Sequence, residues 1–309
     1  MPSIVTITFN PCVDISSSVD VLVPEKKMRC APLVYEAGGG GINVARAIKK
    51  SGGNALAIYL AGGNNGATLQ SLLEAESLDT MLIDTGINTR VNVMMVDKSS
   101  TLQYRFLTAG NSINEKSLEQ CILALEELSN VEYIVVSGSL QTGLPHNIFE
   151  RLSAIAKQKR AKLIIDIPTD AMKAYPIKGA YLLKPNLNEL SMLAGKEELQ
   201  DDEIADVAKI IISRNICEAV VVSMGPAGAL LVTKDITERF ITPAVKVRTT
   251  VGAGDSMVAG IVMYLADNKN IKEAVRFGVA CGTAATLNEG TQLFKIEDAE
   301  KMYHAIRTL

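Results

Sequence analysis

The stretch that decides the fold lies at residues 133–137, which read YIVVS, a short apolar β-branched run that ends in a polar residue. The same pattern returns at 163–166, 181–184 and 219–223, with helix-like segments between the runs. Such alternation is typical of a largely parallel sheet covered by helices on both faces. Ligands bind at the carboxyl ends of the strands in such sheets, so the four polar residues that end the runs predict a binding crevice. These residues are Ser137, Asp166, Lys184 and Ser223.

Two segments depart from this pattern. Residues 14–36 and 90–108 contain alternating apolar and polar positions without a helical pattern between them. Alternation of this kind predicts strands, and we expect a small antiparallel sheet inserted into the α/β body as a lid. An exposed apolar face on that sheet favours dimerisation. Apolar spacing in the last third predicts helices at 255–266, 271–287 and 296–308.

Composition describes an ordinary globular chain. It has 309 residues, of which 48% are apolar and 21% charged, and a formal net charge of -3. A nucleic-acid-binding module carries a basic excess, and this chain has none. No apolar run approaches the roughly 20 residues that span a bilayer, and no signal-peptide pattern precedes the first predicted strand. We therefore expect a cytoplasmic protein with a single domain over residues 1–309, without nucleic-acid or membrane partners.

The chain offers few side chains for thiol or imidazole chemistry. Its five cysteines are scattered without a C-x-x-C pair, which argues against a disulfide framework or a zinc site. Its two histidines, His146 and His304, lie in no motif. We therefore expect chemistry that depends on carboxylates, amines and backbone N–H groups.

A turn of small residues precedes an apolar helical segment at 249–257, which reads TTVGAGDSM. Small residues allow successive backbone N–H groups to face one ligand, and the helix start adds partial positive charge. The turn of Gly252, Ala253 and Gly254 therefore predicts an anion hole, with Asp255 beside it as a base for a hydroxyl group. The alternative is that Asp255 only caps the helix.

Three further segments are candidates for ligand contact. Four glycines at 38–41 precede a helix-like segment, where backbone can approach a ligand closely and Asn43 can hydrogen-bond a polyol; the alternative is a plain flexible turn. Residues 184–189, which read KPNLNE, suit a nucleotide phosphate and hydrated Mg²⁺, but also match a capping box. On the predicted lid, Arg90 and Arg105 can each bind a phosphate or be solvated strand residues.

The order of these motifs resembles that of the ribokinase-like carbohydrate kinases of the phosphofructokinase B family, over essentially the whole chain. The motifs are NPCVD at 10–14, the glycine run with Asn43, KPNLNE at 184–189 and GAGD at 252–255. The resemblance implies a three-layer α/β/α sandwich with a mostly parallel central sheet. It also implies a small inserted β-sheet lid, formed by about 14–36 and 90–108, that commonly pairs two subunits as a homodimer.

The resemblance also implies roles for single residues. Asp255 would be the catalytic base, and Gly252, Ala253 and Gly254 the anion hole. The sugar-phosphate contacts would be Asp14, Gly39, Asn43, Arg90 and Ser139. The ATP contacts would be Lys27, Lys184, Asn186, Ser223, Gly225 and Gly228. Glu189 would hold Mg²⁺ through water, and a K⁺ site would involve Thr249, Val251, Ala285, Asn288 and Gly290. Many relatives have aspartate where Thr249 stands, and Gly-Ser-Leu-Pro-Pro-Gly where residues 138–143 read GSLQTG.

Within the family the similarity is greatest to the 6-phosphofructokinases, which implies Mg²⁺- and ATP-dependent phosphorylation of fructose 6-phosphate at its C1 hydroxyl. Kinases of tagatose 6-phosphate or fructose 1-phosphate stay open as alternatives, because all three substrates need an arginine for the phosphate and an acid for the sugar. Two alternatives come from other classes. A nucleotide-binding oxidoreductase would need a dinucleotide fingerprint that this sequence lacks, and a non-catalytic sugar-phosphate sensor would have a crevice and lid without turnover.

Overall fold

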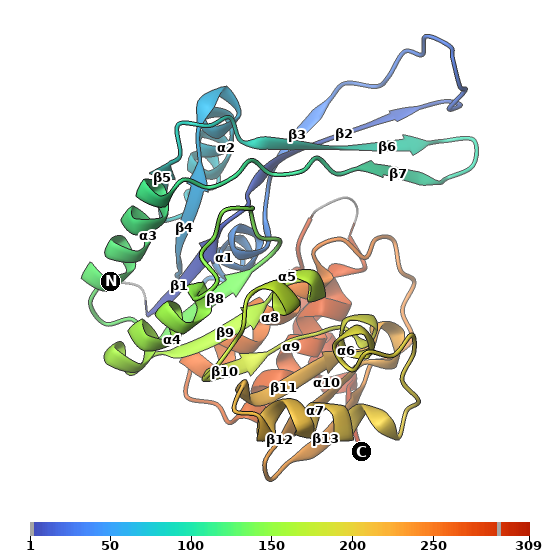
Figure 1. Cartoon of the computed structure of the whole chain (residues 1–309). Helices are drawn as coiled ribbons and strands as arrows, with labels where there is room; N and C mark the ends of the chain where they lie inside the picture. Colours follow the sequence, from blue (N-terminus) through green and yellow to red (C-terminus); the bar gives the residue numbers. More distant parts are fainter. Residues whose placement is uncertain (1–2, 289–291) are drawn as a thin grey trace.

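The predicted parallel strands lie side by side in one large sheet (Figure 1). The computed structural model describes residues 3–288 and 292–309, and within them this sheet has the strand order β14-β13-β12-β11-β10-β9-β8-β1-β4-β5. The strands from β11 to β5 in this order pair in parallel. They are β1 (Ile4–Thr8), β4 (Leu56–Ala61), β5 (Thr80–Asp84), β8 (Tyr133–Ser137), β9 (Lys162–Asp166), β10 (Ala180–Leu183) and β11 (Cys217–Ser223).

Three antiparallel strands extend the sheet beyond β11. They are β12 (Ala229–Thr233), β13 (Thr237–Ile241) and β14 (Arg307–Thr308). The predicted helix at 296–308 is therefore wrong at its end, because α10 (Ile296–Ala305) stops and the chain pairs along β13 through Arg239 and Leu309. The other two predicted helices are α8 (Ala253–Ala266) and α9 (Ile271–Ala285), each shifted by two residues at one end.

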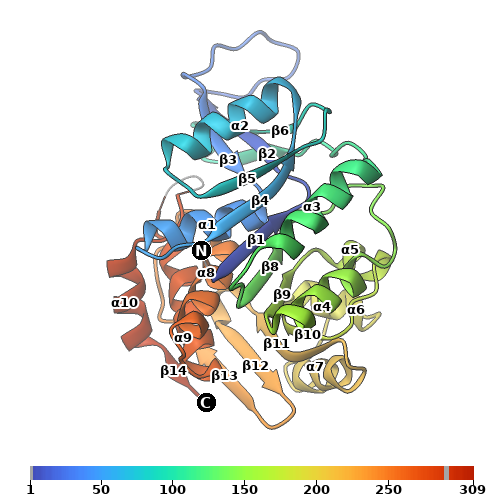
Figure 2. The same cartoon turned by 90° about the vertical axis from the view of Figure 1, so that its left-hand side faces the viewer.

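Helices cover both faces of the sheet, so the body has three layers (Figure 2). The strands send alternate side chains to two separate cores: Ile4 and Val135 belong to one, Val5 and Val136 to the other. The first core is covered by α8, α9, α10, α1 (Gly40–Lys50) and α2 (Gly63–Ala75). The second is covered by α3 (Glu115–Glu127), α4 (Ile148–Lys159), α5 (Thr169–Ala174), α6 (Leu187–Leu193) and α7 (Glu203–Ser213).

A second sheet, here called the lid sheet, extends away from the body (Figure 1). Its strands are, in order, β3 (Val34–Gly38), β2 (Cys12–Val19), β6 (Arg90–Asp97) and β7 (Gln103–Phe106). The prediction of an antiparallel sheet is wrong for the central pair, because β2 and β6 run parallel. The reason is that each antiparallel hairpin comes from its own insertion, with α1, β4, α2 and β5 between them, and the two join through β2 and β6.

The glycine run is required by close packing of α1 on the sheet. A Cβ on Gly40 would lie 2.4 Å from Oγ of Ser137, and one on Gly41 would lie 2.7 Å from the backbone oxygen of Ile7. Gly39 has a φ of 123°, in the region that favours glycine. The run is therefore not a loose turn: it places the start of α1 against the carboxyl ends of β1 and β8.

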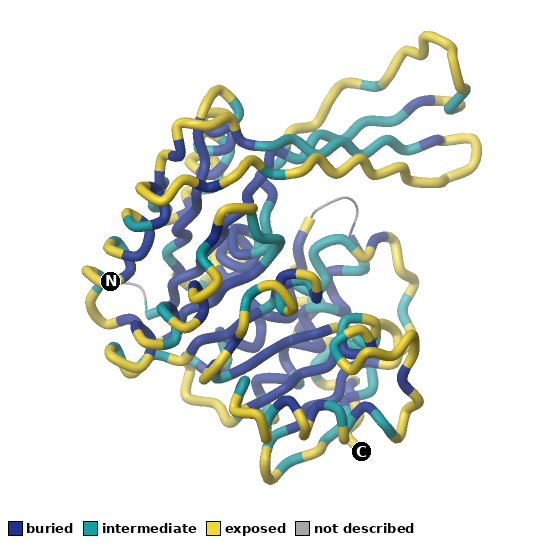
Figure 3. The backbone as a smooth tube through the Cα atoms, in the orientation of Figure 1, coloured by how far each residue is buried: buried dark blue, intermediate teal, exposed yellow. Residues whose placement is uncertain are grey.

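The strands of the body are more deeply buried than those of the lid sheet (Figure 3). All residues of β1 and β8 are buried, whereas all residues of β7 are exposed. In the part of the chain that the structure describes, no helix has the length and apolar character needed to cross a membrane.

Candidate active site

The turn before α8 presents free backbone donors beside Asp255. Gly252 is the N-cap of this helix, with a left-handed φ of 73°. Helical hydrogen bonding begins only at Ser256, whose N–H donates to the backbone oxygen of Gly252 at 2.8 Å. The N–H groups of Gly254 and Asp255 precede it, in the turn where a helix has no internal acceptors for its donors. Asp255 is thus not the N-cap, and its side chain is directed to other elements.

The carboxylate of Asp255 is held from two elements of the body. Asn43 on α1 donates from Nδ2 to Oδ2 at 3.0 Å, and the Ser137 hydroxyl donates to Oδ1 at 3.3 Å. Desolvation and the negative charge of Asp166 raise the pKa of Asp255 to about 6, against those hydrogen bonds and the positive charge of Lys184. At neutral pH the group is therefore an ionised carboxylate of more than ordinary basicity, as a general base requires.

Lys184 supplies positive charge next to the same turn. It is 4% exposed, and its Nζ lies 3.0 Å from Oδ1 of Asp166 and 3.6 Å from the position of a Cβ on Gly254. Burial acts to lower the pKa of Lys184, but the charges of Asp166, Glu189 and Asp255 outweigh it and raise that pKa. Lys184 is therefore an ammonium ion that faces the predicted anion hole.

A cavity of about 490 Å³ opens beside the turn. Its far side is the turn after β11, which includes a short 3₁₀ helix, η1 (Gly225–Ala227). Apolar side chains such as Val245, Val247 and Val279 form much of the wall. A largely apolar pocket with a few polar groups is typical of small-molecule sites. The predicted site residues that line it are Ser223, Gly225, Gly228, Ala253 and Gly254.

Asn186 and Glu189 fix the start of α6. Asn186 Oδ1 accepts a hydrogen bond from the Glu189 N–H, and Glu189 Oε2 accepts one from the Asn186 N–H, both at 2.8 Å. This reciprocal pair is a capping box, so that prediction is confirmed. Burial and the charge of Asp166 raise the pKa of Glu189, against the bond from Asn186 and the charge of Lys184.

A second cavity, of about 230 Å³, lies between the lid sheet and the turn before α8. Asp14 lines it, and its Oδ1 accepts hydrogen bonds from Nδ2 of Asn92 at 2.9 Å and from the thiol of Cys12 at 3.2 Å. Val251 is the lining residue nearest to the anion hole in the chain. Asp255 thus directly follows a turn whose residues line both cavities. The polar residues that line the second cavity are Asp14, Ser16, Glu36, Asn92 and Arg105.

The family model of the pfkB family carbohydrate kinases matches residues 7–299. This chain belongs to that family. It is 40% identical to the ATP-dependent 6-phosphofructokinase isozyme 2 of Escherichia coli (strain K12) over 304 residues, 98% of both chains. It is 31% identical to the 1-phosphofructokinase of Bacillus subtilis (strain 168) over 294 residues, 94% of this chain and 95% of that one.

The fold agrees with this assignment. The crystal structure of phosphofructokinase-2 from Escherichia coli in complex with potassium superposes with a TM-score of 0.93 at 40% identity, and 99% of each chain is covered. The predicted pfkB-type sandwich with its separate small sheet is therefore confirmed, as is its assignment as a sugar-phosphate kinase of the pfkB family.

Arg90 and Ser139, which the family resemblance assigned to the sugar phosphate, contact each other where β6 of the lid sheet begins. The guanidinium of Arg90 is directed at protein acceptors through all of its nitrogens, so binding a phosphate would require it to exchange some of these bonds. Those acceptors are the backbone oxygens of Asn10 at 3.0 Å and Thr108 at 3.3 Å, Oδ1 of Asn92 at 3.2 Å and Oγ of Ser139 at 3.4 Å.

Two parts of the predicted site are placed differently. Lys27 is exposed in the loop 20–33 between β2 and β3, at the outer end of the lid sheet in Figure 1, and not beside the cavity next to α8. For the predicted K⁺ site, the Thr249 N–H donates to the backbone oxygen of Thr286 at 3.4 Å, which places that segment beside the end of α9. Val251, Ala285 and Asn288 belong to the same two segments, and Gly290 lies outside the described residues.

Some residues that contact the predicted site residues belong to none of the sequence motifs. Asp166 pairs with Lys184, and its one sequence signal was its position directly after a buried strand. Asn92, which links Asp14 to Arg90, lies in an unremarkable alternating segment and gave no signal. Such residues become visible only when the sheets bring their strands together.

Proposed function

We propose that this chain transfers the γ-phosphoryl group of ATP to the C1 hydroxyl of fructose 6-phosphate, producing fructose 1,6-bisphosphate and ADP. The observation that carries the proposal is the position of Asp255. Its carboxylate lies in the first turn of α8, directly after residues that line both cavities: Ala253 and Gly254 line the one of about 490 Å³, and Val251 lines the one of about 230 Å³. The 40% identity to a 6-phosphofructokinase supports this substrate over other sugar phosphates.

In the proposed reaction Asp255 accepts the proton of the C1 hydroxyl while that oxygen bonds to the γ-phosphorus. The bond between the γ-phosphorus and the oxygen bridging to the β-phosphate breaks, and ADP leaves with its electron pair. Backbone N–H groups of Gly252, Ala253 and Gly254, with the ammonium of Lys184, stabilise the charge on the transferred group, for which the Ala253 N–H would exchange its 3.4 Å bond to the backbone oxygen of Thr250. No imidazole is needed, which suits a chain with two histidines.

ATP would occupy the larger cavity. Ser223, Gly225 and Gly228 would contact the nucleotide along the turn after β11, and Lys184 and Asn186 would contact its phosphates. Among the described residues, no group of three or more His, Cys, Asp or Glu side chains could hold a metal directly. Glu189 is suited to hold Mg²⁺ through water. Its Oε2 accepts a hydrogen bond from the Asn186 N–H, and its Oε1 remains as an acceptor for a water on the ion. When bound, Mg²⁺ neutralises charge on the phosphates.

Fructose 6-phosphate would occupy the smaller cavity, under the lid formed by residues 14–36 and 90–108. Asp14 and Asn43 would bind sugar hydroxyls, and Gly39 lets backbone approach the sugar. Arg90 and Ser139 would bind the 6-phosphate after exchange of their present hydrogen bonds. A monovalent cation such as K⁺ would be held by oxygens of the segments around Thr249, Val251, Ala285, Asn288 and Gly290, as supported by the potassium complex of the Escherichia coli enzyme.

A homodimer paired through the lid sheets completes the proposal, in a cytoplasmic enzyme. The lid sheet exposes large apolar side chains, among them Val34, Tyr35 and Phe106. Apolar groups gathered on one exposed sheet are typical of interaction surfaces. Because Lys27 lies at the outer end of this sheet, we propose that it serves the nucleotide cavity of a partner subunit.

The test compares kcat/KM for fructose 6-phosphate, tagatose 6-phosphate and fructose 1-phosphate in one coupled assay of ADP release. We expect the highest value with fructose 6-phosphate, and Asp255→Asn to lower kcat by about 10²- to 10⁴-fold. Asp267→Asn, at the exposed C-terminal end of the same helix, is the matched control and should keep wild-type turnover. A strong preference for fructose 1-phosphate, or a folded Asp255→Asn variant with near wild-type turnover, would overturn the proposal.

The same assay separates the enzyme from a non-catalytic sensor. ADP release that needs both ATP and a sugar phosphate supports the kinase. Binding of a sugar phosphate without any ADP release would support the sensor.

A further inference from the structure

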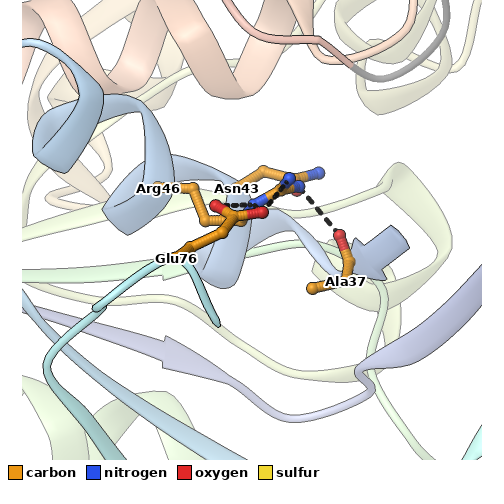
Figure 4. Close-up of polar contacts among 4 residues, drawn as sticks. All are labelled: Ala37, Asn43, Arg46 and Glu76. Carbon is orange, nitrogen blue, oxygen red and sulfur yellow. Dashed lines mark hydrogen bonds and ion pairs between the residues drawn. The ribbon is translucent and has the colours of Figure 1, made fainter. Parts of the chain in front are cut away.

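A buried guanidinium contacts Asn43 (Figure 4), at the other amide atom from the one that faces Asp255. It belongs to Arg46, one turn further along α1 and 4% exposed. Its Nη1 donates to Oδ1 of Asn43 at 3.2 Å and to the backbone oxygen of Ala37 at 2.9 Å. Asn43 therefore has Arg46 at its oxygen and Asp255 at its nitrogen.

Glu76, directly after α2, holds Arg46 in place. Its Oε1 lies 2.6 Å from Nη2 and its Oε2 lies 2.8 Å from Nε, so the two groups meet in a two-pronged pair. Burial acts to raise the pKa of Glu76, but the hydrogen bonds and charge of Arg46 outweigh it, and the pKa is lowered. Both partners are thus ionised at neutral pH, and the guanidinium has little freedom to turn.

The neighbours of Asn43 decide which way its amide faces. A guanidinium can only donate hydrogen bonds, so the amide atom next to Arg46 must be the oxygen. An ionised carboxylate can only accept them, so the atom next to Asp255 must be the NH₂ group. We infer that Arg46 is a positioning residue, which fixes the amide of Asn43 so that its NH₂ group always faces the carboxylate of Asp255. This inference rests on the proposed role of Asp255 as the base.

Without Arg46, only the carboxylate of Asp255 still selects the orientation of the amide, so the amide is held less firmly. Whenever it turns over, two acceptors face each other and the carboxylate loses one of its two side-chain hydrogen bonds. The other groups that act on Asp255 are Asp166, Lys184 and Ser137, and all of them stay in place. Loss of a hydrogen bond to the charged form raises the pKa of a carboxyl group, by about one unit for a single bond of this kind.

Two variants remove the guanidinium. Arg46→Met leaves Glu76 without its partner, which can unfold the protein. The double variant Arg46→Met/Glu76→Leu replaces the ion pair by apolar side chains of similar size, an exchange that buried pairs often tolerate. Arg46→Lys keeps a positively charged donor but cannot form the two-pronged contact with Glu76. The matched control is Arg151→Met, because Arg151 and Glu119 also form a two-pronged pair, through Nη1 and Nη2 at 2.6 and 2.8 Å, between α4 and α3 on the other face of the sheet.

The measurement is kcat/KM for fructose 6-phosphate against pH at saturating ATP, with kcat and KM determined separately at each pH. Phosphate groups of the substrates also titrate near pH 6, but they do so alike for every variant, so the comparison is between variants. The acid limb is the fall in kcat/KM at low pH. We expect it to move up by as much as about one pH unit in the double variant, and by less in Arg46→Lys. Above that limb, kcat should fall and KM should rise, because the Asn43 amide contacts both the base and, in the proposed function, the sugar. The moved acid limb is therefore the readout specific to Asp255.

The control should keep the acid limb of the wild type. A folded double variant with an unmoved limb would overturn the inference, as would an equal shift in Arg151→Met. Wild-type protein without turnover on any of the three sugar phosphates would overturn the proposed function instead. The two failures are therefore distinguishable.

Discussion

The ammonium of Lys184 lies 3.0 Å from the carboxylate of Asp166, at the carboxyl ends of two neighbouring parallel strands, β10 and β9. The two charges act on Asp255 in opposite directions. Asp166 raises the pKa of Asp255, and Lys184 lowers it. The pair therefore adjusts the basicity of Asp255 while it keeps a positive charge beside the proposed anion hole.

Removing one member of this pair should shift the pH profile in a direction set by the charge removed. Lys184→Met should move the acid limb of kcat/KM to higher pH and lower kcat, because positive charge is lost from the transition state. Asp166→Asn should move the acid limb to lower pH. Both profiles are measured on protein whose folding is checked by circular dichroism. Shifts in the same direction for both variants would contradict this account.

The raised pKa of Asp255 also predicts a gain in stability when its charge is removed. Its folded pKa of about 6 exceeds the roughly 3.9 of an unfolded chain, so the folded state binds more protons between these values. Stability therefore falls as the pH rises through this window. Asp255→Asn avoids that loss, since its amide oxygen can accept from Nδ2 of Asn43 and its NH₂ group can donate to the Ser137 hydroxyl.

We expect Asp255→Asn to be more stable than the wild type at pH 8 by about 1–3 kcal/mol, while the difference shrinks toward pH 4. Thermal unfolding at both pH values measures it. An equal or lower Tm for the variant at pH 8 would show that the carboxylate is not destabilised in the fold.

Two glycines in the wall of the larger cavity should differ sharply when changed to alanine. Gly228 has a φ of 93°, and a Cβ there would lie 1.8 Å from the backbone oxygen of Phe240 on β13. Gly225 has a φ of 56° and nothing within 4 Å of its Cβ position. Gly225→Ala should therefore cost only about 1–2 kcal/mol of left-handed backbone strain, and Gly228→Ala several kcal/mol more, because backbone must move. Denaturant unfolding compares the two, and similar losses would contradict the packing argument.

The lid sheet predicts a change of oligomeric state. Phe106 is 58% exposed on β7. Phe106→Asp should yield a monomer by light scattering without a lower Tm of the subunit, because a charge placed in an apolar interface must lose its hydration. The control is Leu123→Asp, at a residue 53% exposed on α3, which should keep the mass of the wild type. A monomeric wild type at working concentration would contradict the proposed dimer.

Much of the body could be predicted because it depends on local pattern. The runs at 133–136 and 219–222 lie within β8 and β11, since continuous β-branched sequence is stable only in a strand buried on both faces. The direction of pairing in the lid sheet could not be predicted, because alternation within one strand contains no information about its neighbour. The end of α10 was missed for the same reason: Arg307 and Thr308 extend only because β13 offers a free edge.

The sequence by itself determined the layers of the sandwich and the family, and it singled out Asp255 as the proposed base, because strand periodicity, motif order and the small residues before Asp255 are local properties. Only the tertiary structure decided how that carboxylate is held. Asn43, Arg46 and Glu76 come from α1 and the end of α2, Asp166 from β9 and Lys184 from the turn after β10. Hydrogen bonds and charges act over a few ångströms of space, whatever the distance along the chain, so these contacts exist only once the layers have packed.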